Sequence, residues 1–301
     1  MAVLWQESEI FRLKKGDRVG LVACSDARPE SGREEVGRLC RILRDAGLVP
    51  VCGRLLFGKG GRTAPAQDRA WELMEFYRDP SVRAVFDLSG GNLANGVLPW
   101  LDFGEIAQSG TIFWGYSDLT AVMGAILSRA GRPSVLWQAR NLVQGGEMGK
   151  IQISRFLESA LGGDRSLFAP ECRMLRGVRM EGETVGGNLR CLLKLAGTPY
   201  WPDLRGKILV LEARSGKSAM IETMLCQLAQ TGAFLQAAGV LLGTFTEMER
   251  EGESPSAEEM VLQLSPSGLP VARTAQIGHG ADSKAILLGS RAVLGDLGDP
   301  E

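Results

Sequence analysis

The sequence predicts an α/β fold organised as two domains, and three observations lead to that prediction. Short β-type apolar runs alternate with amphipathic helical stretches through the first half, as in a parallel sheet with crossover helices. The pattern blurs between Leu142 and Gly182, where glycines and Pro170 interrupt it. A similar alternation then resumes. We therefore expect an N-terminal domain over residues 1–150, an inter-domain crossover over 151–182 and a C-terminal domain over 183–301.

The individual elements follow from apolar spacing and from glycine or polar stops. In the first half, helix 69–77 takes Trp71, Leu73, Met74 and Phe76 as its apolar positions. Strands are expected at 17–24, 49–52, 82–88 and 111–114, and helices at 32–46, 69–77, 119–130 and 151–161. In the second half we expect strands at 207–211, 239–244 and 287–294, a helix after Asn188, another at 218–231, and a solvated acidic loop at 247–256.

Composition excludes several kinds of partner. The chain has 301 residues, with 34 Lys and Arg against 35 Asp and Glu, so it lacks the basic excess that nucleic-acid or anionic-membrane binding needs. Its apolar runs fall far short of the roughly 20 residues of a bilayer span. The N-terminal residues do not read as a secretory signal. We therefore expect a cytoplasmic protein without nucleic-acid or membrane partners.

Cofactor chemistry is equally unsupported. The six cysteines form no C-x-x-C pair, and one histidine without a spaced acidic cluster does not make a zinc site. The sequence also lacks the glycine-rich nucleotide motifs G-x-G-x-x-G and G-x-x-x-x-G-K-[ST] at the places where they would act. We expect neither a metal nor an organic cofactor.

Ser117 is a candidate nucleophile. The run Gly115-Tyr116-Ser117-Asp118 lies where an apolar strand turns directly into a helix, and such a turn lifts the serine out of the sheet. The backbone N–H of Asp118 would then face a developing oxyanion at the start of the helix. Position 119 is Leu, so the second glycine of G-x-S-x-G is missing. The alternative is a plain N-cap.

His279 is the only histidine, so any imidazole base is already identified. A serine hydroxyl needs such a base, held in one tautomer by a carboxylate. Glycines flank His279 and suit an exposed loop near a strand end, where ligands approach closely, although a plain surface residue also fits. Glu212, after an apolar strand, is the best-placed carboxylate, with Asp282 and Glu222 as alternatives.

A second glycine-rich turn, Ser89-Gly90-Gly91-Asn92, follows the strand at 82–88. It should face the same end of the sheet as Ser117, so a backbone N–H of Gly90 or Gly91 is a candidate second oxyanion donor, with Asn92 beside it. The alternative is a turn that uses glycine for its positive φ.

Together these segments resemble the LD-carboxypeptidase family of serine peptidases, which includes muramoyltetrapeptide carboxypeptidases and microcin-immunity peptidases. The likeness spans nearly the whole chain. It rests on motifs that occur in the family's order: Leu13-Lys-Lys-Gly-Asp17, Gly90-Gly-Asn92, Gly115-Tyr-Ser-Asp-Leu-Thr120, Gly186-Gly-Asn-Leu189, Gly197-Thr-Pro-Tyr200, Leu211-Glu212 and Gly278-His-Gly280. The segments Asn95-Gly-Val-Leu-Pro99 and Trp137-Gln-Ala139 depart from the family's pattern near the expected cleft.

The resemblance implies a catalytic triad of Ser117, Glu212 and His279. It also implies a flavodoxin-like or glutamine-amidotransferase-like N-terminal domain, a C-terminal domain with a swivelling-type β core, and a homodimer. The expected reaction releases a terminal D-amino acid from a cytoplasmic murein tetrapeptide, without a cofactor. Two alternatives are the same triad acting on a peptide-nucleotide or other amide conjugate, and a catalytically silent muropeptide-binding protein.

Overall fold

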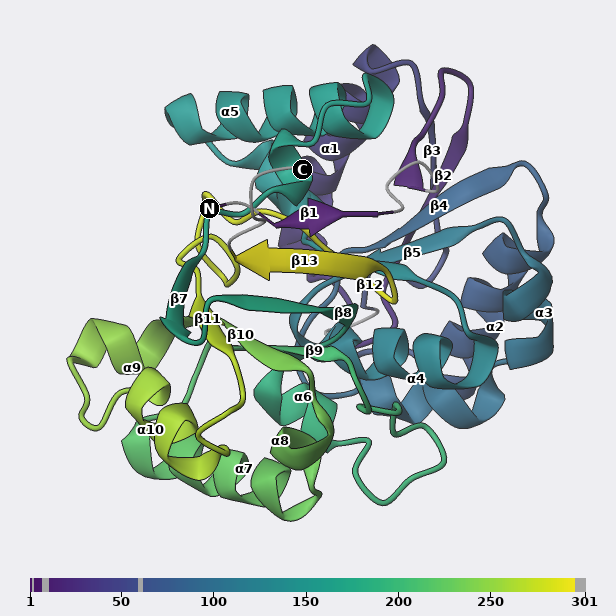
Figure 1. Cartoon of the computed structure of the whole chain (residues 1–301). Helices are drawn as coiled ribbons and strands as arrows, with labels where there is room; N and C mark the ends of the chain where they lie inside the picture. Colours follow the sequence, from purple (N-terminus) through teal and green to yellow (C-terminus); the bar gives the residue numbers. More distant parts are fainter. Residues whose placement is uncertain (2, 7–10, 59–61, 296–301) are drawn as a thin grey trace.

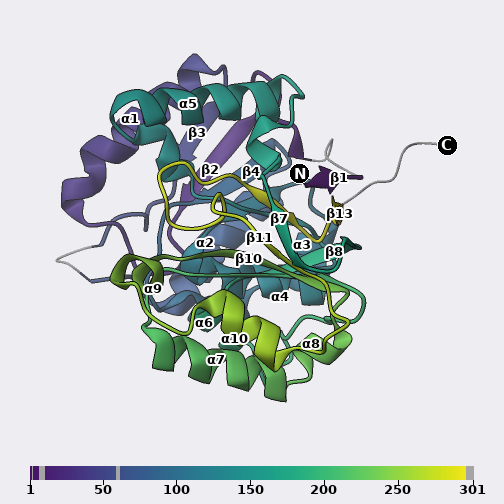
Figure 2. The ribbon, with the colours of Figure 1, turned by 60° about the vertical axis from the view of Figure 1, so that its left-hand side comes forward.

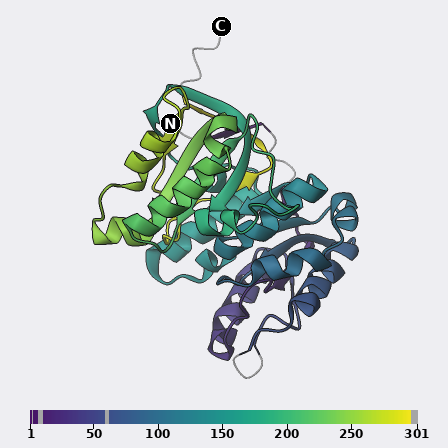
Figure 3. The ribbon, with the colours of Figure 1, turned by 90° about the horizontal axis from the view of Figure 1, so that it is seen from below.

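The computed structural model describes residues 1, 3–6, 11–58 and 62–295. Two mixed β-sheets with flanking helices make up an α/β fold (Figure 1). The first sheet has the strand order β12-β6-β5-β4-β2-β3 and the second β1-β13-β8-β9-β10-β11-β7. In Figure 3 the first half of the chain, purple to blue, lies beside the green and yellow second half.

The first sheet is parallel except for β12, which runs antiparallel to β6. The apolar strands over residues 18–22, 82–87 and 112–115 are largely covered on both faces, as parallel strands between helices are, whereas the edge strand over 49–52 is partly exposed. The strands of this sheet are β2 (Arg18–Val22), β3 (Val49–Cys52), β4 (Val82–Asp87), β5 (Ile112–Gly115), β6 (Ser134–Leu136) and β12 (Ile286–Leu288).

Helices of the first half connect and cover these strands (Figure 1). In the first of them, Val36, Leu39 and Leu43 are buried, in keeping with the apolar spacing that predicts the helix at 32–46. In the second, Trp71 is 52% exposed whereas Tyr77 is buried, so the predicted apolar face was wrong at Trp71. These helices are α1 (Arg33–Asp45), α2 (Ala66–Arg78), α3 (Phe103–Gln108), α4 (Thr120–Ala130) and α5 (Gly146–Phe156).

The second sheet has a parallel centre, β8-β9-β10-β11, and antiparallel outer strands. Every residue of β9 is buried, which explains the apolar run from Ile208 to Leu211. The strands are β1 (Leu4–Trp5), β7 (Arg173–Arg176), β8 (Arg179–Asn188), β9 (Ile208–Ala213), β10 (Gly239–Phe245), β11 (Val271–Arg273) and β13 (Arg291–Gly295). Residues 151–182 therefore contain β7 and the start of β8.

Helices of the second half pack below this sheet (Figure 2). They are α6 (Leu189–Leu193), α7 (Ser218–Gln230), α8 (Ala233–Gln236), α9 (Thr246–Glu251) and α10 (Ala257–Leu264). The prediction of a loop at 247–256 was wrong in part, because α9 occupies its first residues. Glu247 accepts a hydrogen bond from Gly216 N and Glu253 accepts one from Ser218 N, so these acids bind backbone donors at the start of α7.

The predicted final strand at 287–294 is two strands in different sheets. Gly289, at φ 79°, and Ser290 separate β12 from β13, which pairs with β8. Near the other end of the chain, β1 also joins the second sheet through β13. Each sheet therefore includes strands from distant parts of the chain, and the linking segment between β11 and β12 passes from one sheet to the other.

Candidate active site

Ser117 occupies a strained turn between β5 and α4. Its φ of 57° is the one positive φ among the described residues other than glycine. Left-handed backbone at a serine between strand and helix is the geometry of a nucleophile elbow. A Cβ at Gly115 would lie 2.8 Å from Leu119 Cβ, so the glycine two residues before Ser117 leaves room for the Leu119 side chain. The turn thus forms without a glycine at position 119.

Glu212 and His279 form a hydrogen-bonded pair. Glu212 lies within β9, which extends beyond the predicted strand end, and its side chain is fully buried. Its Oε2 atom is 2.9 Å from His279 Nδ1. The His279 side chain is only 12% exposed, although a more exposed loop was predicted. Its Nε2 atom is buried and has no hydrogen-bond partner, so this nitrogen remains available to a ligand or a hydroxyl.

Asn188 fixes the other oxygen of this carboxylate. Its Nδ2 atom donates to Glu212 Oε1 over 2.8 Å, and the two residues are register partners on β8 and β9. Glu212 therefore has one oxygen for the amide and one for the imidazole, as a tautomer-setting carboxylate needs. The sequence analysis noted Gly186-Gly-Asn188 only as part of a resemblance. Of the alternative acids, Glu222 is exposed on α7, and Glu212 is the acid bonded to His279.

Tyr116 packs against the imidazole. The ring centroids of Tyr116 and His279 are 4.9 Å apart in an edge-on arrangement. Burial and the nearby Glu212 carboxylate raise the pKa of the Tyr116 phenol well above its ordinary value, so the phenol stays neutral. This aromatic wall restricts the rotation of His279.

Ser117 and His279 line one cavity of about 320 Å³, which we call the central cavity. Gly90 and Gly91 line it as well. No hydrogen bond joins Ser117 to His279, because Nε2 of the histidine is unpaired. Catalytic hydrogen bonds are often long before substrate binds. The structure thus brings Ser117, His279, Gly90 and Gly91 to one cavity, with Glu212 buried behind the imidazole.

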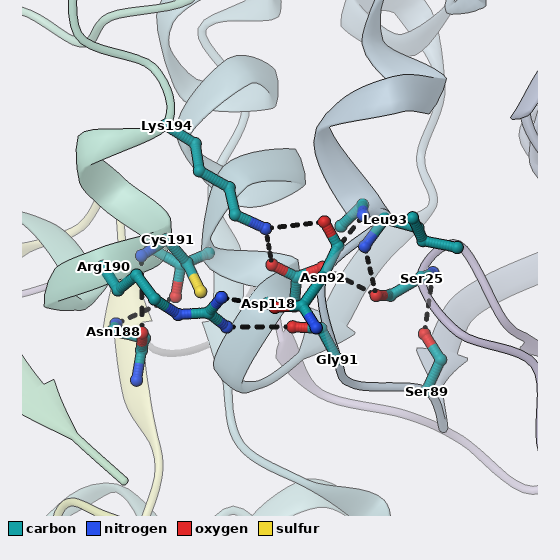
Figure 4. Close-up of polar contacts among 12 residues, drawn as sticks. Ser25, Ser89, Gly91, Asn92, Leu93, Asp118, Asn188, Arg190, Cys191 and Lys194 are labelled. Atoms are coloured by element: carbon teal, nitrogen blue, oxygen red, sulfur yellow. Dashed lines mark hydrogen bonds and ion pairs between the residues drawn. The ribbon is translucent and has the colours of Figure 1, made fainter. Parts of the chain in front are cut away.

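Asp118 is a structural anchor at this site. Its fully buried carboxylate accepts hydrogen bonds from Ser25 Oγ at 2.6 Å and Ala94 N at 2.9 Å, and pairs with Lys194 (Figure 4). Burial alone would raise the pKa of Asp118, but the bonds from Lys194, Ser25 and Ala94 outweigh it and lower this pKa. Only its backbone N–H remains a candidate oxyanion donor.

The glycine turn is held from both halves of the molecule. Gly91 has a φ of 118°, and a Cβ there would lie 1.9 Å from Asp26 Oδ2, so the position excludes other residues. Lys194 donates to Asn92 O and Arg190 donates to Gly91 O and to Asn92 Oδ1 (Figure 4). The Asn92 side chain is thus engaged by Arg190, and Asn92 lines a neighbouring cavity together with Ser117.

Sequence reasoning also missed the charged walls of the site. Arg28, Arg140 and Arg214 line the central cavity. Arg28 and Arg214 lie in the loops after β2 and β9, and Arg140 lies in a short 3-10 helix (Ala139–Val143) after β6. That position was the available signal, since such loops carry the sites of α/β proteins. Within the part of the chain that the structure describes, no three His, Cys, Asp or Glu side chains gather as a metal ion would need.

Comparison with known proteins identifies the family. The model of the LD-carboxypeptidase N-terminal domain matches residues 19–136, and that of the LD-carboxypeptidase C-terminal domain matches residues 181–294. A probable murein peptide carboxypeptidase of Bacillus subtilis (strain 168) is 31% identical over 94% of this chain and 90% of its own. A murein tetrapeptide carboxypeptidase of Pseudomonas aeruginosa is 28% identical over 76% of this chain and 77% of its own.

The fold has solved counterparts. The microcin C7 self-immunity protein MccF, in complex with aspartyl sulfamoyl adenosine, superposes with a TM-score of 0.83 at 19% identity, over 95% of this chain and 97% of that chain. The two domain models and the relative of Bacillus subtilis show that the protein is a serine-type hydrolase. The chain belongs to the LD-carboxypeptidase family. No helix among the described residues is both long enough and apolar enough to cross a bilayer.

Proposed function

We propose that the protein hydrolyses an L,D-amide bond and releases a terminal D-amino acid, D-Ala, from a murein tetrapeptide in the cytoplasm, with Ser117, His279 and Glu212 as its triad. The observation that carries this proposal is the buried Glu212–His279 pair beside a cavity shared with the strained Ser117. The names of the murein peptide carboxypeptidases among its relatives favour this substrate class.

The reaction follows from the roles of these groups. Ser117 Oγ attacks the amide carbonyl while His279 Nε2 takes its proton, and the same imidazole then passes that proton to the leaving amine. Glu212 holds the Nδ1–H tautomer and stabilises the imidazolium, and Asn188 orients Glu212. Water, deprotonated by His279, then releases the acyl group from Ser117.

The oxyanion needs two donors. We assign them to the backbone N–H groups of Asp118 and of Gly90 or Gly91, with Asn92 supporting the turn through its bond from Arg190. Losing one such donor typically costs about 3 to 4 kcal/mol of transition-state stabilisation. A flavodoxin-like N-terminal domain, a swivelling-type C-terminal core and a homodimer remain predictions.

Ser117→Ala tests the proposal. The variant should fold normally and lose turnover of the tetrapeptide L-Ala-γ-D-Glu-diaminopimelate-D-Ala, followed as D-Ala release by mass spectrometry. Ser215→Ala is a matched control, because Ser215 is an exposed serine that lines the two cavities beside the central one. Undiminished turnover by Ser117→Ala would remove Ser117 from the mechanism.

A second candidate substrate is an aminoacyl-nucleotide conjugate. The fold likeness to MccF in complex with aspartyl sulfamoyl adenosine favours testing it. Incubation with aspartyl sulfamoyl adenosine and with the tetrapeptide, analysed side by side, separates the two. Faster hydrolysis of the conjugate would replace the murein substrate while leaving the triad in place.

A further inference from the structure

Two arginines share one carboxylate at the wall of the central cavity. Arg28 follows β2 and Arg140 follows β6, and both reach Glu35 in the first turn of α1. Arg28 Nη2 lies 2.5 Å from Glu35 Oε2, and Arg140 Nε lies 2.8 Å from Glu35 Oε1. Each oxygen of Glu35 thus has its own guanidinium. Two positive charges meet one negative charge, so this cluster carries a net charge of about +1.

The two guanidinium groups are held close together with little solvent around one of them. The Arg28 side chain is only 14% exposed, whereas that of Arg140 is 43% exposed. Burial lowers the pKa of Arg28, and the repulsion from the neighbouring Arg140 acts in the same direction, whereas Glu35 opposes both effects. An incoming anion would relieve that repulsion.

Both arginines line the cavity that holds Ser117 and His279. Among the hydrogen bonds of the described residues, Arg140 uses only Nε, so its two Nη groups remain for a ligand. Among the described residues, neither acid of the cavity, Asp26 or Asp87, forms an ion pair with Arg28 or Arg140. Asp87 accepts from Cys24 N and Ser89 Oγ, and both Asp87 and Asp26 act on the buried Arg69 guanidinium.

We propose that Arg28 and Arg140, held by Glu35, form a carboxylate-binding subsite of the central cavity. This inference rests on the proposed function and deepens it. A guanidinium fork matches a carboxylate in shape and charge, and a carboxypeptidase substrate must carry a free one. The tetrapeptide has three free carboxylates: the terminal α-carboxylate of the leaving D-amino acid, the side-chain carboxylate of diaminopimelate, and the α-carboxylate of the γ-linked D-Glu. The first two belong to the residues joined by the scissile bond, and the proposal concerns these two.

Two pairs of peptide substrates, each differing in one carboxylate or its charge, test whether the subsite binds that carboxylate. The first pair is the tetrapeptide as free acid and as C-terminal amide; the second pair carries diaminopimelate or lysine at its third position. Arg140→Gln removes the charge at a half-exposed position, so the fold should tolerate it. Arg250→Gln is the matched control, because Arg250 lines an adjoining cavity but pairs with Glu251.

Arg140→Gln should lower kcat/KM for the peptide with the recognised carboxylate by about 10- to 100-fold, the effect of losing one charged hydrogen bond. Loss confined to the free acid, with the amide unchanged, assigns the terminal carboxylate. Loss confined to the diaminopimelate peptide assigns the side-chain carboxylate. Arg140→Lys should recover part of the loss, because it restores charge without the fork.

The free-acid diaminopimelate tetrapeptide belongs to both pairs, so three peptides are compared. An equal loss on all three, or no loss on any, would overturn the subsite. Binding to Ser117→Ala, measured by calorimetry with the acid and the amide and with the diaminopimelate and lysine peptides, decides the inference independently of turnover. If the unsubstituted protein hydrolyses no peptide, the proposed function fails. A calorimetric preference within either pair that Arg140→Gln abolishes still supports the subsite, and no preference within both pairs refutes it.

Discussion

Asn188 shows how one amide directs the imidazole. It satisfies one oxygen of Glu212, so the other oxygen is left for His279 Nδ1. Its backbone N–H also donates to Thr120 Oγ1 at 2.9 Å, which connects it to the helix that follows Ser117. A single residue thus touches both the carboxylate and the nucleophile's helix.

Asn188→Ala should therefore lower kcat more than it raises KM. The buried Glu212 oxygen would lose its donor, which costs about 1 to 3 kcal/mol, and the carboxylate would hold the imidazole less firmly. We expect a roughly 10- to 100-fold fall in kcat with the tetrapeptide. Tyr116→Phe is the comparison, because it keeps the ring beside His279 and should change kcat little. A normal kcat in Asn188→Ala would contradict the positioning role.

At the scale of elements, the segment between β11 and β12 carries His279 and is held by side chains of the first half. Gln152, fully buried in α5, donates to Ala281 O at 2.8 Å and to Ser283 O at 3.0 Å. Trp137 Nε1 also donates to Ser283 O. Trp137, a departure from the family's pattern, thus has a structural role.

Gln152→Leu should misplace the His279 segment. The substitution keeps the volume but removes both hydrogen bonds from Gln152, so Ser283 O keeps only the bond from Trp137 Nε1 and Ala281 O only the longer one from Gln144 Nε2. We expect a lower kcat together with increased amide hydrogen exchange in residues 276–285. Gln138→Leu, at a cavity-lining residue outside these bonds, serves as the control for exchange. Unchanged exchange in the segment would count against this anchoring.

The sequence predicted the positions of helices and strands better than it predicted which strands pair with one another. Apolar spacing identified α1, β4, β5, α4 and α7 because these elements bury one periodic face or a continuous run. Periodicity says nothing about which sheet a strand joins, so the split between β12 and β13 was missed. Similarly, the residue type and spacing singled out His279 and Glu212, whereas Asn188, Arg28 and Arg140 depend on long-range pairing that a single sequence does not display.

At the scale of the whole molecule, Asp118 connects loops next to the first sheet with a segment next to the second sheet. Its carboxylate joins the loops after β2 and β4 to Lys194, which follows α6 (Figure 4). Because its pKa is lowered in the folded protein, Asp118 contributes stability that is present above its ordinary value of 3.8 and is lost as pH falls through its folded value.

Asp118→Asn should destabilise the protein by about 3 kcal/mol at pH 7, because it leaves the Lys194 charge largely buried without its partner. The difference from the unsubstituted protein should shrink as the pH falls below 3.8 toward the lowered folded pKa, where Asp118 itself becomes protonated. Urea unfolding across pH 3 to 7 measures both effects. Asp203→Asn, which removes an exposed pair with Arg205, is the control and should change unfolding less. A pH-independent difference would contradict the assignment.

The exchange of strands between the sheets has a consequence for dissecting the chain. Cutting after residue 150 would leave β6 of the first fragment with a bare backbone edge where β12 belongs, and would take β1 away from β13 of the second. Neither fragment would form its complete sheet alone. Activity would return on mixing only if the two fragments associated and paired these strands again. The segment between β11 and β12 also carries His279. A separation of the two sheets would therefore move the imidazole away from Ser117 and abolish activity before the core of either sheet unfolds.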